Sequence, residues 1–199
     1  MVYVVFPTPY ADWIALTLFV SAAATDYADG YLARKWNQIT NIGRMLDPIA
    51  DKAIVLIALL VLATLWFGDV RVMIPIILIV FREVFVSGLR EFLGDKANTL
   101  HVTKLAKWKT TVQMMAIILL LAAQLFQHYV LVLVYGMEDV MYASILSGET
   151  EDLVGLVWKD FGFIWATQVG LWLLWAAAAL TVITGFDYFR KALPILKET

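Results

Sequence analysis

The sequence contains no cysteine and only two histidines among its 199 residues. A disulfide framework and thiol catalysis are therefore excluded. The histidines, His101 and His128, lie far apart and lack the spacing of metal ligands. A basic tail and a glycine-rich phosphate loop are also absent, which argues against binding of nucleic acid and against a P-loop nucleotide site.

Charge is scarce as well. Charged residues make up 16% of the chain and apolar residues 62%, whereas soluble proteins carry roughly 25% charged residues. Three stretches contain no Asp, Glu, Lys or Arg, namely 53–67, 110–137 and 161–186. Apolar runs of about 18 residues can cross a bilayer core of roughly 30 Å. A soluble helical bundle would need polar helix faces, and residues 114–123 offer none, so the composition indicates a membrane protein.

We predict an all-α fold, a polytopic helical membrane protein that forms a single domain over residues 1–199. Five full spans are expected, at Ala11–Arg34, Pro48–Phe67, Val72–Phe92, Leu105–Phe126 and Phe161–Phe186. Residues 127–160 are expected to form an acidic extracytoplasmic loop that serves as a solvated connector. Within this loop, Tyr129–Tyr135 is too short to span the membrane and is placed at the interface.

The positions of the basic residues predict the orientation of the spans in the membrane. All of the 15 Lys and Arg except Arg71 and Lys159 lie between the first two spans or at their ends, around the connection of the third and fourth spans, or in the tail. The positive-inside rule therefore places these segments in the cytoplasm and the N-terminus outside. We accordingly predict a multi-pass protein of a bacterial cytoplasmic (inner) membrane.

Four aspartates carry the most specific pattern in the chain. Asp26 and Asp29 are three residues apart, and Asp47 and Asp51 are four apart, so each pair shares one helix face. Pro48 suits the first turn of a new helix. Carboxylates at a membrane edge are costly unless paired or bound to a cation. Oxygen ligands without His or Cys suit Mg²⁺, Mn²⁺ or Ca²⁺, and four carboxylates can hold two ions for phosphoryl chemistry.

The segment around these aspartates reads D-x2-D-G-x2-A-R-x8-G-x3-D-x3-D, from Asp26 to Asp51. This pattern resembles the signature of the CDP-alcohol phosphotransferases, and every fixed position matches. The resemblance implies a six-helix membrane fold, a homodimer and a site for two ions, Mg²⁺ or Mn²⁺. From this resemblance we expect the family's first helix to be largely missing, with residues 1–10 as its remnant.

The resemblance also assigns roles within the segment. It implies that Asp26, Asp29, Asp47 and Asp51 bind the metals and that Asp51 is the catalytic general base. The residues that it places against the CDP moiety are Gly30, Ala33, Arg34 and Gly43.

Two further stretches, Arg82–Leu93 and Lys104–Met114, resemble those of the bacterial phosphatidylglycerophosphate synthase branch. That branch transfers a phosphatidyl group from CDP-diacylglycerol to sn-glycerol 3-phosphate and releases CMP. One departure is Ala106, where glycine is common in the branch. The likeness weakens after about Gln124.

Basic residues in these stretches suit an anionic acceptor. Arg82 and Arg90 are eight residues apart and lie on roughly one helix face. Lys107 and Lys109 begin the next span from the same side. We predict that these four side chains bind the phosphate of glycerol 3-phosphate. An unpaired Arg82 would be costly within the membrane, and a purely structural ion pair with Glu83 is the alternative.

Other functions remain open at this point. Within the family, the acceptor could be phosphatidylglycerol, as in cardiolipin synthases, or an inositol phosphate. A cation-binding membrane transporter is the alternative from another class, because intramembrane carboxylates also mark ion paths. The expected partners are CDP-diacylglycerol, glycerol 3-phosphate, the lipid bilayer and a second copy of the chain, and no nucleic acid is expected.

Overall fold

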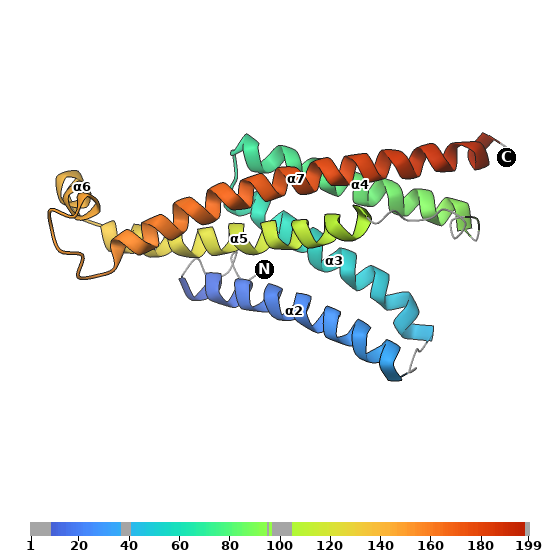
Figure 1. The fold of residues 1–199 in the computed structure, drawn as a ribbon, viewed down its shortest axis with the longest axis horizontal. Helices are drawn as coiled ribbons and strands as arrows, with labels where there is room; N and C mark the ends of the chain where they lie inside the picture. The colour runs from blue at the N-terminus through green and yellow to red at the C-terminus, as the bar shows by residue number, and fades with distance from the viewer. Residues whose placement is uncertain (1–8, 37–40, 95, 97–104, 198–199) are drawn as a thin grey trace. The chain divides into compact units, whose positions relative to one another are not determined.

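The computed structural model describes residues 9–36, 41–94, 96 and 105–197, with the backbone alone for residues 26–36, 41–48, 51 and 105–107. The described residues form helices and no strand. The helices are α2 (Pro9–Trp36), α3 (Asn41–Leu65), α4 (Val70–Leu93), α5 (Leu105–Val134), α6 (Asp139–Ser147) and α7 (Leu156–Lys197) (Figure 1). The predicted all-α class is confirmed.

Three of these helices are long and apolar enough to cross a membrane, at Val70–Leu93, Trp108–Val134 and Leu156–Lys197. A shorter apolar helical segment covers Lys52–Leu65. The chain is therefore a polytopic helical membrane protein. The predicted spans in α2 and α3 stay predictions. Parts of both helices lie outside the residues whose side chains are described, and only described residues were assessed as membrane spans.

The chain divides into two compact units, which we describe separately. The first unit consists of Met1–Gln38 and Ile117–Gly170. Within it, α5 and α7 approach closely at two glycines. A Cβ on Gly162 would come within 3.0 Å of Phe126, and one on Gly170 within 3.0 Å of Leu120. Small residues allow such close helix packing where no water drives association.

The amino-terminal end of α2 is joined to the carboxyl-terminal half of α5 by two polar contacts. The Asp12 carboxylate lies 2.7 Å from Nδ1 of His128, and Asp12 is buried. The Trp13 indole donates a hydrogen bond of 3.1 Å to the Tyr129 hydroxyl. These contacts place Tyr129 within α5, which continues to Val134. Residues 129–134 therefore belong to α5 and not to the predicted connector, because the apolar run extends the helix. Their placement at the membrane interface stays a prediction.

The second unit consists of Ile39–Ala116 and Leu171–Thr199. Its helix α3 begins at Asn41, so Pro48 lies inside the helix and not in its first turn as the sequence suggested. The helix tolerates Pro48 although a proline ring cannot donate a backbone hydrogen bond. The start at Asn41 also brings Gly43 into the same helix as Asp47 and Asp51.

Helix α4 has a buried stripe and also large apolar side chains that are exposed. Its buried residues recur along one stripe that includes Val72, Ile76 and Ile79, as expected for a helix with one face toward protein. Large apolar side chains such as Phe81 and Phe92 remain exposed on the other side. At its start, the Trp175 indole of α7 donates a hydrogen bond of 3.0 Å to the Arg71 carbonyl.

The short α6 and the start of α7 depart from the predicted plain connector. Helix α7 begins at Leu156, five residues before the predicted span, because Asp152 caps it. The Asp152 carboxylate accepts hydrogen bonds from the backbone N–H groups of Leu156 (2.8 Å) and Val157 (2.9 Å). These hydrogen bonds lower the pKa of Asp152 below its usual value of 3.8.

We expect Asp152→Ala to loosen the first turn of α7, because two backbone donors lose their acceptor. Amide exchange at Leu156 and Val157 should become faster, and the melting temperature should fall by a few degrees at most. Since the pKa of Asp152 is lowered on folding, its stabilising effect is present above pH 3.8 and is lost as the pH falls further. Glu151→Ala, an exposed change in the same loop, is the control and should leave this exchange unchanged.

Candidate functional site

A polar cluster lies among the four helices of the second unit, and Glu83 of α4 is its centre. The Glu83 carboxylate accepts a hydrogen bond of 3.1 Å from Nη1 of Arg82 and another from Nζ of Lys109 on α5. Side-chain exposure is only 15% for Arg82, 13% for Glu83 and 9% for Lys109. A half-buried carboxylate thus joins a half-buried arginine of its own helix and a buried lysine of α5.

Helix α3 enters the same cluster through Lys52. The Lys52 ammonium group donates a hydrogen bond of 2.6 Å to the Ser87 hydroxyl, which in turn donates one of 2.6 Å to the Glu83 carbonyl. Both Arg82 and Lys52 lie close enough to act electrostatically on Lys109. We call Lys52, Arg82, Glu83, Ser87, Lys109 and Thr184 the Glu83 cluster.

Helix α7 closes the cluster at Thr184 and Gly185. Nη2 of Arg82 donates a hydrogen bond of 3.2 Å to the Thr184 hydroxyl, which itself donates one of 2.8 Å to the Leu180 carbonyl. A Cβ on Gly185 would lie 2.7 Å from Cγ and 3.1 Å from Nε of Arg82. The arginine therefore passes over a helix surface where no side chain is present.

The charges of the described cluster do not balance. Lys52, Arg82 and Lys109 are cations, and Glu83 is the carboxylate that they surround. Nε of Arg82 is buried and has no hydrogen-bond partner among the described residues. An excess of positive charge in a place of low dielectric constant calls for an anion. Chemically, the cluster is suited to holding a phosphate group.

The structure separates the predicted phosphate-binding residues. Arg82 and Lys109 meet in the Glu83 cluster, whereas the exposed Arg90 lies with its guanidinium group 5.6 Å from the centre of the Tyr188 ring. Arg82 and Arg90 thus both contact α7, at Thr184 and Tyr188, which agrees with their predicted common face. The side chain of Lys107 lies outside the described residues.

The four aspartates lie in two different helices, as predicted. The backbone is helical through Asp26 and Asp29 in α2 and through Asp47 and Asp51 in α3. Each pair therefore keeps its helical spacing. Their side chains lie outside the described part of the structure, as do those of the predicted CDP-binding residues Gly30, Ala33, Arg34 and Gly43. No metal-binding group of three or more His, Cys, Asp or Glu is found among the side chains that are described, and metal binding by the four aspartates stays a prediction.

Comparison with known proteins decides the family. The sequence model of the CDP-alcohol phosphatidyltransferases matches residues 1–145. The chain belongs to this family. The match includes α2, α3 and α4 in full and the whole of α5. It therefore contains the four aspartates and most of the Glu83 cluster, but not Thr184 or Gly185.

Similar curated proteins extend over nearly the whole chain. A CDP-diacylglycerol–glycerol-3-phosphate 3-phosphatidyltransferase of Cereibacter sphaeroides is 52% identical over 198 residues, which is 100% of this chain and 90% of the relative. Proteins with the same description from Rickettsia bellii and Shigella flexneri are 39% and 37% identical, over 92% and 94% of this chain and 81% and 82% of the relatives. No solved structure matches the chain with significance.

In this CDP-alcohol phosphatidyltransferase, the sequence did not predict that Lys52, Ser87, Thr184 and Gly185 lie together in one cluster. Lys52 entered the sequence-based prediction only as one of the basic residues that indicate the orientation of the spans. Ser87 and Thr184 are ordinary residues in apolar helices, and no spacing marks them. Gly185 carried a usable signal, because a glycine inside a membrane span often marks close packing. The ion pair of Arg82 with Glu83, which the sequence analysis gave as the alternative to phosphate binding, is present, and phosphate binding by Arg82 stays a prediction.

Proposed function

We propose that this chain transfers a phosphatidyl group from CDP-diacylglycerol to sn-glycerol 3-phosphate, giving phosphatidylglycerol phosphate and CMP. The observation that carries the proposal is the 52% identity, over the whole chain, to a relative with that described activity. The complete aspartate signature between Asp26 and Asp51 supports the same class of reaction.

The charge of the Glu83 cluster favours this acceptor within the family. A phosphate monoester carries about −1.5 to −2 at pH 7, and the described cluster has three cations against one carboxylate. Phosphatidylglycerol, the acceptor of cardiolipin synthases, is a diester with a single negative charge. Neutral alcohols such as inositol and serine have no phosphate. An inositol phosphate would match the charge equally well, so the acceptor must be tested directly.

The aspartates suit a pair of Mg²⁺ or Mn²⁺ ions. Asp26, Asp29, Asp47 and Asp51 offer only carboxylate oxygens, which are the ligands that these ions prefer. Each pair lies at helical spacing on a continuous helix. When bound, such ions would offset the negative charge of the diphosphate. Gly30, Ala33, Arg34 and Gly43 would lie against the CDP moiety, where the small residues allow close approach of the nucleotide.

The residues of the chain then have distinct tasks. Asp51 accepts the proton of the attacking hydroxyl of glycerol 3-phosphate. The freed oxygen forms a bond to the β-phosphorus, and the bond from that phosphorus to the bridging oxygen breaks, so that CMP leaves with the bridging oxygen. Arg82, Arg90, Lys107 and Lys109 hold the acceptor phosphate. Orientation of the two substrates supplies much of the rate enhancement in reactions of this kind.

An acceptor panel tests the proposed function. The purified protein in detergent receives CDP-diacylglycerol with radiolabelled glycerol 3-phosphate, inositol phosphate, phosphatidylglycerol or glycerol, and CMP release is measured. We expect the fastest turnover with glycerol 3-phosphate. Faster turnover with another acceptor would move the protein to another branch of the family. Absence of CMP release with every acceptor, together with cation flux in liposomes, would favour the transporter.

Arg90→Gln should raise the KM for glycerol 3-phosphate by roughly 10–150-fold, because one charge-assisted contact contributes about 1.5–3 kcal/mol. The KM for CDP-diacylglycerol should hardly change. Arg90→Lys should recover the activity only in part, since an ammonium group cannot grip phosphate with two parallel donors. Arg190→Gln removes a cation from the exposed surface of α7 and is the control. Equal increases in both KM values would make Arg90 a structural residue.

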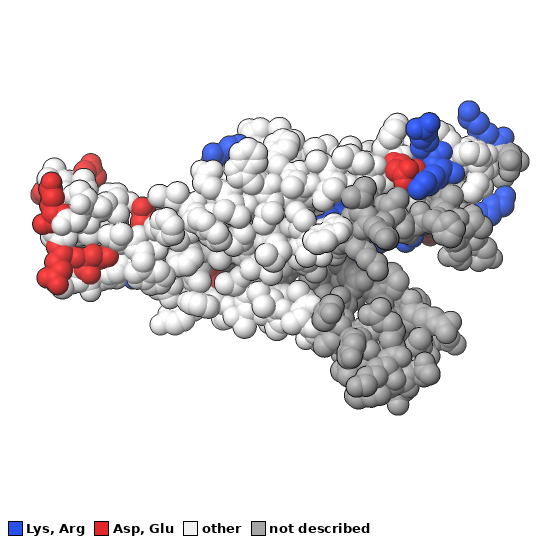
Figure 2. Space-filling model, viewed as in Figure 1, with Lys and Arg blue, Asp and Glu red and all other residues white. Residues whose placement is uncertain are grey.

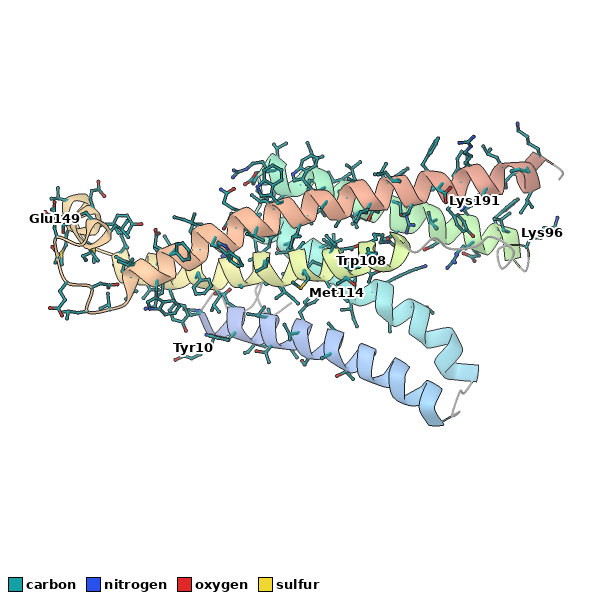
Figure 3. The ribbon with its side chains drawn as sticks, in the orientation of Figure 1. Tyr10, Lys96, Trp108, Met114, Glu149 and Lys191 are labelled. Atoms are coloured by element: carbon teal, nitrogen blue, oxygen red, sulfur yellow. The ribbon has the colours of Figure 1, made fainter. Side chains whose placement is uncertain are left out.

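We also propose the cytoplasmic membrane of a bacterium as the location, with the active site toward the cytoplasm. Acidic side chains gather over α6 and its flanking loops, and basic side chains gather near the carboxyl-terminal ends of α4 and α7 (Figure 2). Glu149 and Lys191 represent the two groups (Figure 3). The two basic residues predicted outside have local partners. Arg71 pairs with Asp69 at 2.8 Å, and Lys159 donates to the Val154 carbonyl at 2.6 Å. A homodimer remains part of the proposal.

Single cysteines will test this orientation on a background that has none. A cysteine at Ser147 should react with an impermeant thiol reagent in intact cells, whereas a cysteine at Thr103 should react only after lysis. The physical reason is the excess of Lys and Arg on the segments near Thr103. The reverse labelling pattern would place the site on the side away from cytoplasmic nucleotides and would contradict the proposed orientation.

A further inference from the structure

The position of Arg82 depends on its contacts with Thr184 and Gly185 of α7. Its guanidinium group is held from two sides, by Glu83 at Nη1 (3.1 Å) and by Thr184 at Nη2 (3.2 Å). Its aliphatic stem lies against Gly185, where a Cβ would come within 2.7 Å of Cγ. Glycine has no side chain, so the stem of Arg82 occupies the space that any other residue would fill.

We infer that Gly185 and Thr184 of α7 are positioning residues for acceptor binding, which act by holding Arg82 in the Glu83 cluster. This inference rests on the proposed role of Arg82 in binding the acceptor phosphate. The two residues do not themselves touch the substrate. They fix the rotamer of an arginine whose Nε is buried and has no hydrogen-bond partner among the described residues.

The surroundings of Arg82 explain why its position needs such support. Arginine has a long side chain with about 2 kcal/mol of rotamer entropy to lose, and Lys109 competes for the same carboxylate oxygen of Glu83. The Thr184 hydroxyl bonds back to the Leu180 carbonyl at 2.8 Å, so it is itself fixed on α7. Two contacts on the guanidinium group and one on the stem leave Arg82 little freedom. A preformed donor binds an anion without having to be ordered first.

Gly185→Ala tests this inference without changing any charge. The added methyl group would displace the Arg82 stem, because 2.7 Å is far inside van der Waals contact. We expect the KM for glycerol 3-phosphate to rise by roughly 10-fold or more, within the range for one lost charge-assisted contact, while the KM for CDP-diacylglycerol stays within about 2-fold. Gly88→Ala on α4 is the matched control, since its Cβ would meet nothing within 4 Å.

A double-mutant cycle separates positioning from general damage to the helix. Arg82→Gln alone tests the proposed function, because it should raise the KM for glycerol 3-phosphate whatever the role of α7. If Gly185 acts through Arg82, then Gly185→Ala should add little to the KM in the Arg82→Gln background. Equal effects of Gly185→Ala in both backgrounds, or equal rises of both KM values, would overturn the inference.

Thr184→Val provides a second variant in case Gly185→Ala does not fold. It keeps the shape of the side chain and removes the hydroxyl that accepts from Nη2 of Arg82. The expected result is again a rise in the KM for glycerol 3-phosphate that vanishes in the Arg82→Gln background. Unchanged KM values in Thr184→Val and Gly185→Ala, both folded, would show that α7 does not position Arg82.

Discussion

Asp29→Asn is expected to reduce turnover by more than about 100-fold. The reason is that Asp29 would share two cations with Asp26, Asp47 and Asp51, and that even loss of a residue next to a metal ligand typically costs 10–100-fold. Asparagine keeps the shape of the side chain but removes the negative charge that a divalent cation needs. Turnover should be measured by CMP release while Mg²⁺ or Mn²⁺ is titrated after treatment with EDTA.

Direct measurement of metal binding tests the Asp29→Asn variant independently of its activity. Calorimetric titration of the detergent-solubilised protein with Mn²⁺ should show weaker binding to Asp29→Asn than to the unmodified chain. The control is Asp187→Asn, which removes an exposed carboxylate that pairs with Lys191 on α7 and should change neither quantity. Full activity of Asp29→Asn in metal-free buffer would refute the assignment of the aspartates.

Asp51→Asn should lower the rate of the chemical step by roughly 10²–10⁴-fold, the usual contribution of a general base. Binding of CDP-diacylglycerol should largely survive, because the residues proposed to contact CDP lie mainly on α2. Equilibrium binding of CDP-diacylglycerol and single-turnover rates would separate the two effects. Disappearance of substrate binding together with turnover would make Asp51 a binding residue first.

Asp47→Asn is the informative comparison for the proposed base. Both aspartates lie one helical turn apart on α3, and both would bind metal, but only Asp51 would also accept the proton. Raised Mn²⁺ should therefore restore part of the activity of Asp47→Asn and little of that of Asp51→Asn. Equal recovery of the two variants would leave Asp51 as a metal ligand alone.

Much of the fold could be predicted because long apolar runs leave few alternatives. Residues 72–92 were expected to be helical, and α4 covers Val70–Leu93. The errors lie where helices end outside the bilayer core. Hydropathy does not mark the start of α7, which is fixed by the polar contacts of Asp152. It also gives no reason to form α6. The continuation of α5 to Val134, by contrast, follows the uncharged run over residues 110–137.

The site was predictable only where its residues are close in sequence. The spacing of Asp26 and Asp29, or of Asp47 and Asp51, follows from the helix alone. The pairing of Arg82 with Glu83 was also expected, since the two are neighbours in the chain. In contrast, the contact of Arg82 with Thr184 joins residues 102 positions apart, and it depends on how α4 packs against α7. No local pattern encodes such a contact.

The contact of Arg82 with α7 also bears on how the family can diversify. The catalytic signature and Arg82 lie inside residues 1–145, which the family's sequence model covers, whereas Gly185 and Thr184 lie beyond it. If Arg82 binds the acceptor as proposed, changes in the last helix would alter how firmly this cation is held while the aspartate signature stays constant. Exchange of α7 between relatives that use different alcohols offers a route to alter acceptor preference without touching an aspartate.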